Sequence, residues 1–251
     1  MKSRFDMLVV QQGLAESREK AQRLIRAAQI RVNGQVMTKP GVQVSTDVIL
    51  DLESPPRFVS RGGDKLQGAF DVWPDLSVTD RVCIDIGSST GGFTDCLLQH
   101  GAVQVYAVDV GKGQLHWDLR NHPQVTVMEQ VNARYLQPQD FDPRPDFGVT
   151  DVSFISLRLI LPAADRVLRP GATMISLIKP QFEAGAANLR KGVVIDPAIH
   201  EQVVDEIRTF GQHELGWTCE AVIPSPLKGP AGNIEFLARW QKPILSTPET
   251  L

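Results

Sequence analysis

Four charged residues stand in otherwise apolar segments, where a charged side chain is costly to bury without a partner. They are Lys65, Asp151, Lys179 and Glu235. Asp151 and Lys179 each end a segment that reads as a strand, so we expect both at one edge of a sheet. Two lysines and two carboxylates at that edge could move a proton and orient a hydroxyl group. The alternative is a buried ion-pair network that only stabilises the domain.

A glycine-rich loop, GSSTGG, follows the first of the apolar strand-like segments. The residues after it read as a short helix that ends at Gly101, and residues 104–111 read as a second strand. A glycine loop between a strand and a helix of a parallel βαβ unit is typical of nucleotide-like ligand sites in open α/β sheets. Asp109 ends the second strand about twenty residues later, where an acid can accept hydrogen bonds from ribose hydroxyls.

The spacing of this loop differs from the G-x-G-x-x-G pattern of dinucleotide sites. Asp85 stands two residues before Gly87, and an acid there suits a ligand with a positive end. S-Adenosyl-L-methionine carries an ammonium and a sulfonium group and no phosphate, so we predict it as the cofactor. A tight turn that merely requires glycine is the alternative. The predicted cofactor-binding residues are Asp85, Gly87, Ser88, Ser89, Gly91, Gly92, Phe93, Asp109, Asn132 and Asp151.

The elements that position these residues alternate between strands and helices, which indicates a doubly wound α/β domain. Asn132 follows the third strand, in a loop that faces the adenine in such sheets. Glu235 is expected inside the last strand, Lys65 in a helix before the first strand, and Gly171 as the cap of a helix. Strands are expected at 81–87, 104–111, 125–130, 147–151, 173–179, 217–227 and 233–240, and helices at 61–70, 91–101, 155–171 and 197–216.

The amino-terminal part of the chain differs from the rest in charge. Residues 1–60 carry nine Lys or Arg and six Asp or Glu, whereas the remainder carries 17 basic and 23 acidic residues. A basic segment before an acidic one hints at contact with a polyanion. The segment at 53–63, ESPPRFVSRGG, is rich in proline and glycine and is the best linker candidate. We predict domains at 1–55 and 64–251, joined by a linker at 56–63.

The basic segment contains a predicted helix that begins at Ser17, a good N-cap. Its basic side chains point away from the apolar stripe formed by Ala21, Leu24, Ile25 and Ala28. Short strands follow, with Asn33-Gly34 as a tight hairpin turn. This arrangement fits either a solvated helix face or a helix that docks on a phosphate backbone.

The stretch RFDMLVVQQGLAESREKAQRLI, followed by IRVNGQ and KPG, resembles the small RNA-binding module first known from a ribosomal protein, the S-four domain. The resemblance covers roughly the first fifty residues. Ala28 stands where a glycine is usual between the helix and the strand. The resemblance implies a small α+β RNA-binding domain whose RNA-binding residues are Arg4, Arg18, Lys20, Arg23 and Arg26.

The four charged residues follow one another in the order Lys-Asp-Lys-Glu, which resembles the catalytic tetrad of the FtsJ-type ribose methyltransferases. Together with the S-four module, several stretches are similar to the TlyA family, also called haemolysin A: SRGGDKL, DIGSSTGGFTD, TDVSFISL, LIKPQFE, KGVVID and GPAGNIEFL. That family methylates ribose 2'-hydroxyls of ribosomal RNA, typically on cytidine. The resemblance runs over nearly the whole chain. It implies a Rossmann-like class I methyltransferase sheet, S-adenosyl-L-methionine as cofactor, ribosomal RNA and ribosomal subunits as partners, and Lys65, Asp151, Lys179 and Glu235 as catalytic residues.

Each of the four residues has a plausible chemical task. Lys179 could take the proton of the ribose hydroxyl, if a second cation nearby favours its neutral amine. The two carboxylates favour the ammonium instead, so they suit the task of orienting the lysines and the hydroxyl. Because a sulfonium is already an activated methyl donor, holding oxygen, carbon and sulfur in line supplies much of the acceleration. This chemistry requires no metal.

Composition excludes several other classes of protein. The 251 residues carry a net charge of -3 and are 42% hydrophobic, which is ordinary for a globular protein. No apolar run approaches the roughly 18 residues that span a bilayer, and the start is too polar for a secretory signal. The cysteines, Cys83, Cys96 and Cys219, lie far apart in apolar stretches and indicate reduced thiols without a metal site. We therefore expect a cytoplasmic protein with no membrane or metal partner.

Three rival functions stay open at this point. A non-catalytic ribosome-binding or assembly factor could keep the fold, although an intact set of four charged residues argues against it. A membrane-active haemolysin would need a spanning segment or a strongly amphipathic anchor, which the sequence does not offer. A methyltransferase that acts on protein would leave the basic amino-terminal module unexplained.

Overall fold

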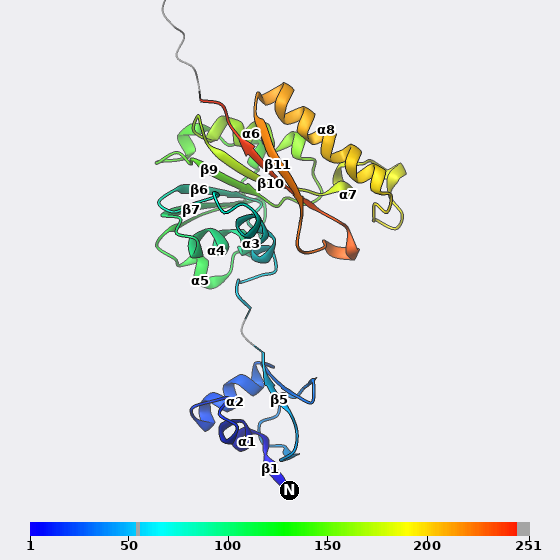
Figure 1. Cartoon of the computed structure of the whole chain (residues 1–251). Coiled ribbons are helices and arrows are strands. Elements are labelled where there is room, and N and C mark those ends of the chain that lie inside the picture. Colours follow the sequence, from blue (N-terminus) through cyan, green and yellow to red (C-terminus); the bar gives the residue numbers. More distant parts are fainter. Residues whose placement is uncertain (54–55, 245–251) are drawn as a thin grey trace, which may run out of the picture. The chain divides into compact units, whose positions relative to one another are not determined.

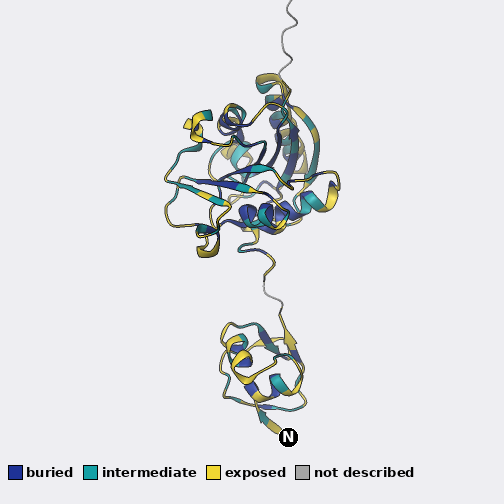
Figure 2. Ribbon diagram, turned by 90° about the vertical axis from the view of Figure 1, so that its left-hand side faces the viewer, coloured by how far each residue is buried: buried dark blue, intermediate teal, exposed yellow. Residues whose placement is uncertain are grey.

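The computed structural model describes residues 1–53 and 56–244 (Figure 1). The chain divides into two compact units, Met1–Pro56 and Arg57–Leu251. Each unit has its own hydrophobic core. In Figure 2 the ribbon of each unit is coloured by burial, and both units contain buried residues in dark blue beside exposed residues in yellow.

The small unit packs two helices against short antiparallel strands. Strand β1 pairs with β4, and β2 pairs with both β3 and β5. The core is formed by apolar side chains from both helices and from three of the strands. The elements are β1 (Lys2–Arg4), α1 (Phe5–Gln11), α2 (Arg18–Arg26), β2 (Ile30–Val32), β3 (Gln35–Val36), β4 (Gln43–Ser45) and β5 (Leu50–Leu52).

Local sequence signals explain how the small unit is built. The hydroxyl of Ser17 accepts a hydrogen bond from the backbone N–H of Lys20, so Ser17 caps helix α2 as predicted. Asn33 and Gly34 both have positive φ angles, which confirms the tight turn between β2 and β3. Ala28 adopts a left-handed conformation with φ of 60°, so the chain keeps the turn for which glycine is usual.

The larger unit is built on one seven-stranded sheet with the order β11-β12-β10-β9-β6-β7-β8. The neighbours from β10 to β8 pair in parallel, and β12 runs antiparallel to β10 and β11. This doubly wound sheet confirms the predicted α/β architecture. The strands are β6 (Val82–Ile86), β7 (Gln104–Asp109), β8 (Val125–Glu129), β9 (Phe147–Thr150), β10 (Thr173–Ile178), β11 (Thr218–Pro224) and β12 (Phe236–Gln241).

Helices cover both faces of this sheet (Figure 1). Alternate residues of β10 point to opposite faces: Met174 and Ile178 pack with α6 and α8, whereas Ile175 and Leu177 pack with α3 and α4. A sheet covered on both faces needs near-continuous buried strands, and the central strands β9 and β10 are buried along their whole length. The helices are α3 (Gly62–Val72), α4 (Gly92–Gln99), α5 (Trp117–Arg120), α6 (Leu161–Val167), α7 (Pro180–Glu183) and α8 (Pro197–Leu215).

Several predicted element boundaries are wrong, including that of the strand expected at 217–227, which ends at Pro224. The helix expected at 155–171 divides into a single 3-10 turn, Leu157–Leu159, and the shorter α6, whose Pro162 stands in its first turn. Helix α6 ends in an extended residue, Leu168, so Gly171 does not cap it. The strand expected from residue 233 begins only at Phe236, and Glu235 lies just before it.

The segment proposed as a linker is largely packed. The side chain of Phe58 is buried in the core of the larger unit, and α3 begins at Gly62. Gly63 lies against the Phe58 ring, where an added Cβ would approach a ring carbon to 2.2 Å. Residues from Phe58 onward therefore belong structurally to the larger unit, because an aromatic side chain anchors them there.

Candidate active site

The site lies where the parallel strands of the larger unit end. Strands β6, β7, β9 and β10 all run in one direction, so their carboxyl ends share one edge of the sheet. The glycine loop follows β6, Asp109 ends β7, Asp151 follows β9 and Lys179 follows β10. Such an edge is the usual ligand position in an open α/β sheet.

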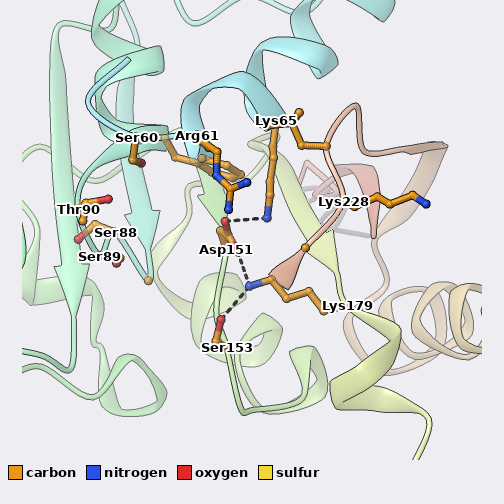
Figure 3. Close-up of a pocket in the computed structure, with 16 residues that line it drawn as sticks. Ser60, Arg61, Lys65, Ser88, Ser89, Thr90, Asp151, Ser153, Lys179 and Lys228 are labelled. Carbon is orange, nitrogen blue, oxygen red and sulfur yellow. Dashed lines mark hydrogen bonds and ion pairs between the residues drawn. The ribbon is translucent and has the colours of Figure 1, made fainter. Parts of the chain in front are cut away.

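The four predicted charged residues form one chain of contacts. The Nζ of Lys179 is 2.6 Å from Oδ1 of Asp151, and the Nζ of Lys65 is 3.7 Å from Oδ2 of the same carboxylate. Lys65 also donates a hydrogen bond of 2.7 Å to Oε2 of Glu235. Figure 3 shows Lys65 and Lys179 reaching Asp151 from different elements. The structure thus brings all four residues together.

This cluster is buried, yet its charges are balanced. Lys65, Lys179 and Glu235 are almost inaccessible, and Asp151 is partly exposed. Glu235 also accepts a hydrogen bond of 3.1 Å from Nε2 of Gln181. Gly229 lies so close to this carboxylate that an added Cβ would come within 2.1 Å of Oε1. Removing one member would leave a buried charge without its partner, which is costly.

One cavity of about 300 Å³ opens beside this cluster, and we call it the lysine cavity (Figure 3). It has cationic and hydroxyl groups on its walls, with backbone from the glycine loop. Its lining comes from five separate segments of the larger unit. The lining residues are Ser60, Arg61, Gly62, Lys65, Gly87, Ser88, Ser89, Thr90, Gly92, Phe93, Asp151, Ser153, Lys179, Leu227, Lys228 and Gly229.

A second cavity of about 440 Å³ adjoins the first, and we call it the Asp109 cavity. Its walls are mainly apolar, with Asp109 and Asn132 among its few polar groups. The two cavities share Gly87, Ser89, Asp151 and Ser153. The lining residues are Ile86, Gly87, Ser89, Val108, Asp109, Val110, Gln114, Val131, Asn132, Ala133, Arg134, Asp151, Val152, Ser153, Phe154, Ile155 and Ile160.

The glycine loop needs glycine at its tightest point. Gly87 has a φ of 85°, and a Cβ there would approach a methyl group of Val152 to 2.9 Å and the carbonyl oxygen of Asp151 to 3.1 Å. A side chain at this position would therefore be strained and would also press on the segment after β9. Gly87 lines both cavities, so its small size keeps backbone exposed to them.

Asp109 organises this loop while lining the second cavity. Its Oδ2 accepts a hydrogen bond of 2.8 Å from the backbone N–H of Ser89, and its Oδ1 accepts one of 2.6 Å from Gly111. Each carboxylate oxygen has further lone pairs that a ligand hydroxyl could use. Asn132 begins a 3-10 turn and accepts a hydrogen bond from the N–H of Arg134.

Two predicted cofactor residues do not line either cavity: Asp85 and Gly91. Asp85 is fully buried, and its Oδ2 accepts a hydrogen bond of 2.7 Å from the Thr94 hydroxyl. Its Oδ1 has no hydrogen-bond partner in the described part of the chain. Burial raises the pKa of Asp85 to about 7. Asp85 therefore connects β6 to α4, beneath the loop that we expected it to complement.

The predicted RNA-binding residues of the small unit fall into two groups. Arg4 and Arg18 both contact the buried carboxylate of Asp6, at 3.0 Å and 2.9 Å. Hydrogen bonds from Arg4, Gln22 and Arg18 hold the pKa of Asp6 far below its usual range. The second group, formed by Lys20, Arg23 and Arg26, is exposed on helix α2.

Sequence reasoning missed several polar residues of the site, among them Ser153, Gln181 and Lys228. The hydroxyl of Ser153 accepts a hydrogen bond of 2.9 Å from Nζ of Lys179. Ser153 and Gln181 each stand two residues after a predicted charged residue, at the end of a strand. Their position in the sequence could have identified them, because residues that follow the ends of parallel strands lie at the same edge of the sheet as the ligand site.

Over residues 1–53 and 56–244, no group of three or more His, Cys, Asp or Glu side chains could hold a metal ion. No helix in those ranges is long and apolar enough to cross a membrane. Cys83, Cys96 and Cys219 are free thiols.

Comparison with known proteins agrees with this geometry. The FtsJ-like methyltransferase family matches residues 58–242, and the S4 domain, the S-four module expected above, matches residues 3–50. The chain is 49% identical to YqxC of Bacillus subtilis, named as an rRNA methyltransferase, over 96% of this chain and 86% of the relative. It is 44% identical to the 16S/23S rRNA (cytidine-2'-O)-methyltransferase TlyA of Mycobacterium tuberculosis, over 94% of this chain and 88% of the relative.

A solved structure from Streptococcus thermophilus, named as a hemolysin, is 46% identical and has a TM-score of 0.74. That likeness covers 96% of this chain and 89% of the other. Sequence and structure thus lead to one assignment. The chain belongs to the FtsJ-like methyltransferase family, within the group of TlyA and haemolysin A proteins that carry an S4 domain.

Proposed function

We propose that this chain transfers a methyl group from S-adenosyl-L-methionine to a ribose 2'-hydroxyl of ribosomal RNA, on cytidine. The observation that carries the proposal is the contact chain from Glu235 through Lys65 and Asp151 to Lys179, open to a polar cavity. A second, mainly apolar cavity adjoins that one, so two ligands can meet at the residues that the cavities share.

The Asp109 cavity fits the cofactor. The carboxylate of Asp109 stands at the end of β7, where it can accept hydrogen bonds from ribose hydroxyls. Apolar walls that include Val131 and Ile160 suit an adenine ring, and Asn132 offers it a polar edge. Gly87 leaves room that a side chain would fill. When bound, S-adenosyl-L-methionine supplies a methyl group on a positively charged sulfur.

The lysine cavity suits the ribose that receives the methyl group. Lys179 would take the proton of the 2'-hydroxyl on its Nζ atom, as a general base. Asp151, at 2.6 Å from that nitrogen, would hold the amine in place and stabilise the ammonium that forms. Because Asp151 lines both cavities, it would also help to align the hydroxyl with the methyl group.

Lys65 and Glu235 would support Asp151 and Lys179 indirectly. Lys65 contacts both carboxylates, so it balances the charge of Asp151 and fixes its orientation. Glu235, which is 1% exposed, holds Lys65 in that position. These two residues therefore support the geometry, and we expect milder losses of rate from their removal than from removal of Lys179 or Asp151.

The choice of RNA as substrate rests on the small unit and on the relatives. The S4 match covers most of that unit, and its helix α2 exposes three cations on one side. A cationic helix face can neutralise phosphates of an RNA backbone. The TlyA relative of Mycobacterium tuberculosis is named for cytidine and for both 16S and 23S rRNA, which is the basis for proposing cytidine here.

The decisive experiment is methyl transfer from radiolabelled S-adenosyl-L-methionine to purified small and large ribosomal subunits that lack the modification. Digestion of the RNA to nucleosides should yield labelled 2'-O-methylcytidine from at least one subunit. A non-catalytic ribosome-binding factor would bind the subunits and leave them unlabelled. Label on a base or on a ribosomal protein would contradict the proposal.

The cofactor assignment has its own test in Asp109. Asp109→Ala should weaken binding of S-adenosyl-L-methionine by about 1.5 to 3 kcal/mol, because a charged acceptor is lost. Asp109→Asn keeps the size of the side chain and should give a smaller loss. Calorimetry on both variants measures this, with the exposed Asp118→Ala as a control. Unchanged affinity in a folded Asp109→Ala protein would contradict the assignment.

A further inference from the structure

Ser153 lies at the open end of the contact chain that begins at Glu235. It is exposed, and it lines both the lysine cavity and the Asp109 cavity. Its Oγ accepts a hydrogen bond of 2.9 Å from Nζ of Lys179 (Figure 3). Ser153 therefore touches the proposed base from the side where the two ligands would meet.

Two oxygens lie beside the Nζ atom of Lys179: Asp151 forms an ion pair with it, and Ser153 accepts a hydrogen bond from it. Oδ1 of Asp151 is 2.6 Å away, and Oγ of Ser153 is 2.9 Å away. A neutral lysine amine is roughly tetrahedral, with two N–H bonds and one lone pair. The hydrogen bond to Oγ of Ser153 fixes one N–H bond, and the negative charge of Asp151 disfavours a lone pair that points at its carboxylate, so the lone pair is confined to the remaining directions. Only a base whose lone pair points at the hydroxyl can take its proton efficiently.

We infer that Ser153 is a positioning residue that directs the lone pair of Lys179 toward the acceptor hydroxyl. This inference rests on the proposed function. Without Ser153, the amine keeps only Asp151, a carboxylate that it already shares with Lys65 at 3.7 Å. The amino group of Lys179 could then rotate about the Cε–Nζ bond, and its lone pair would lose its fixed direction.

The chemical type of the group that Ser153 places beside Lys179 also matters. A second carboxylate at this position would favour the ammonium form of the lysine and so oppose its use as a base. A hydroxyl carries no charge, so it accepts the N–H bond with far less preference for the charged form. Serine thus supplies direction while adding little electrostatic cost to proton uptake.

The alternative is that Ser153 only stabilises the loop after β9. Its exposure argues against a large packing role, because its truncation removes little buried surface. Ser156 provides a matched comparison three residues later. Its hydroxyl donates a hydrogen bond of 2.6 Å to Oε2 of Glu183, and it lines neither cavity.

The test compares Ser153→Ala, Ser153→Thr and Ser156→Ala in single-turnover methylation of ribosomal subunits at saturating cofactor and RNA. Ser153→Ala should lower the rate about 10- to 100-fold, while affinity for cofactor and RNA stays within about two-fold. Ser153→Thr restores the hydroxyl and should recover most of the rate. Ser156→Ala should stay within about two-fold of the wild type.

A second measurement does not depend on methylation. In ¹H–¹⁵N spectra of the full chain, the Lys179 side-chain signal, identified by its loss in Lys179→Arg, should broaden or shift in Ser153→Ala and return in Ser153→Thr. An unchanged Lys179 signal in Ser153→Ala would overturn the inference even if the wild type proved inactive. A wild-type methylation rate in Ser153→Ala, or equal losses in both alanine variants, would overturn it as well.

Discussion

Asp6 in the small unit and Asp85 in the larger unit are both completely buried, and these two carboxylates have opposite pKa shifts. Asp6 of the small unit contacts Arg4, Arg18 and Gln22, and these partners hold its pKa far below the usual range. Asp85 of the larger unit contacts Thr94 and, within residues 1–53 and 56–244, pairs with no cation, and burial raises its pKa to about 7. Burial alone therefore does not decide the charge of a buried acid; the partner does.

The cluster around Asp151 combines features of both cases. Its charges are paired, as at Asp6, but one end opens on a cavity that a substrate can enter. The arginines at Asp6 pair with a buried carboxylate away from both cavities, whereas Lys179 lines the lysine cavity. This contrast separates charges that stabilise a unit from charges that are available for chemistry.

The largest expected effect on the methylation rate comes from removing the side chain of Lys179, which lines the lysine cavity. Lys179→Ala should lower the single-turnover rate of methylation about 100- to 10,000-fold, because the proposed general base is lost. RNA affinity should stay nearly unchanged, since one cation is a small part of a multi-contact interface. Filter binding and methylation on one preparation measure both quantities.

The exposed Lys191, which lines neither cavity, provides the control for this change. Lys191→Ala should retain the wild-type rate. If the lysine cluster served only stability, Lys179→Ala would lower the melting temperature, the RNA affinity and the rate together. Near-normal methylation by a folded Lys179→Ala protein would rule out this lysine as the base.

The raised pKa of Asp85 can be tested by measuring how the stability of the protein depends on pH. Its folded pKa of about 7 lies above its unfolded value near 3.9, so the folded state holds more protons between these values. Stability from this group is therefore highest at low pH and falls as pH rises through that range. Asp85→Asn removes the effect, so the variant should gain about 4 kcal/mol over the wild type between pH 4 and pH 8.

Urea unfolding followed by tryptophan fluorescence measures this change, because all four tryptophans, at 73, 117, 217 and 240, lie in the larger unit. The expected result is a difference between variant and wild type that grows with pH. A difference that stays constant from pH 4 to pH 8 would show that Asp85 does not titrate in this range.

Asp6 should show the opposite trend. Its folded pKa is lowered, so its contribution to stability is present above the unfolded value and is lost as the pH falls through the acid range. Asp6→Asn should destabilise the small unit by roughly 2 kcal/mol at neutral pH, and the loss should shrink below about pH 4. Hydrogen exchange of amides in residues 1–53 measures this locally, with the exposed Asp51→Asn as a control.

The smallest effects concern the cations of the small unit. Replacing Lys20, Arg23 and Arg26 by glutamine should reduce the slope of RNA affinity against salt by about one unit per residue. Replacing Arg4 and Arg18 should mainly destabilise the unit, because Asp6 loses its partners. Arg31→Gln, whose arginine pairs with Glu53, is the control. An equal loss of salt dependence in both sets would contradict the expectation that Arg4 and Arg18 mainly stabilise the small unit.

Local patterns in the sequence were sufficient to predict much of this molecule. Alternating apolar runs predicted seven strands, and the parallel order of the central ones placed Asp151 and Lys179 at one edge. Ser17 as a cap and Asn33-Gly34 as a turn also followed from residue type. These features depend on interactions within a few residues, which a sequence displays directly.

Boundaries were harder to predict where distant contacts or proline intervene. Pro162 starts α6 later than the apolar pattern suggested, and the chain leaves the helix before Gly171. Glu235 precedes its strand, although the backbone oxygen of Glu235 still accepts a hydrogen bond from Ser225 of the neighbouring segment. Such contacts join segments that the sequence alone does not show to be adjacent.

By itself the sequence determined which residues could carry chemistry and which strand ends would present them, because both depend on residue type and local periodicity. Only the tertiary structure decided their partners. Lys65 meets Glu235 across 170 positions, and Lys179 meets Ser153 across 26. Asp6 gains its two arginines and Asp85 gains none, although both are buried. The register of β12 on β10 and the packing of helices on the sheet set these distances, and no local pattern records them.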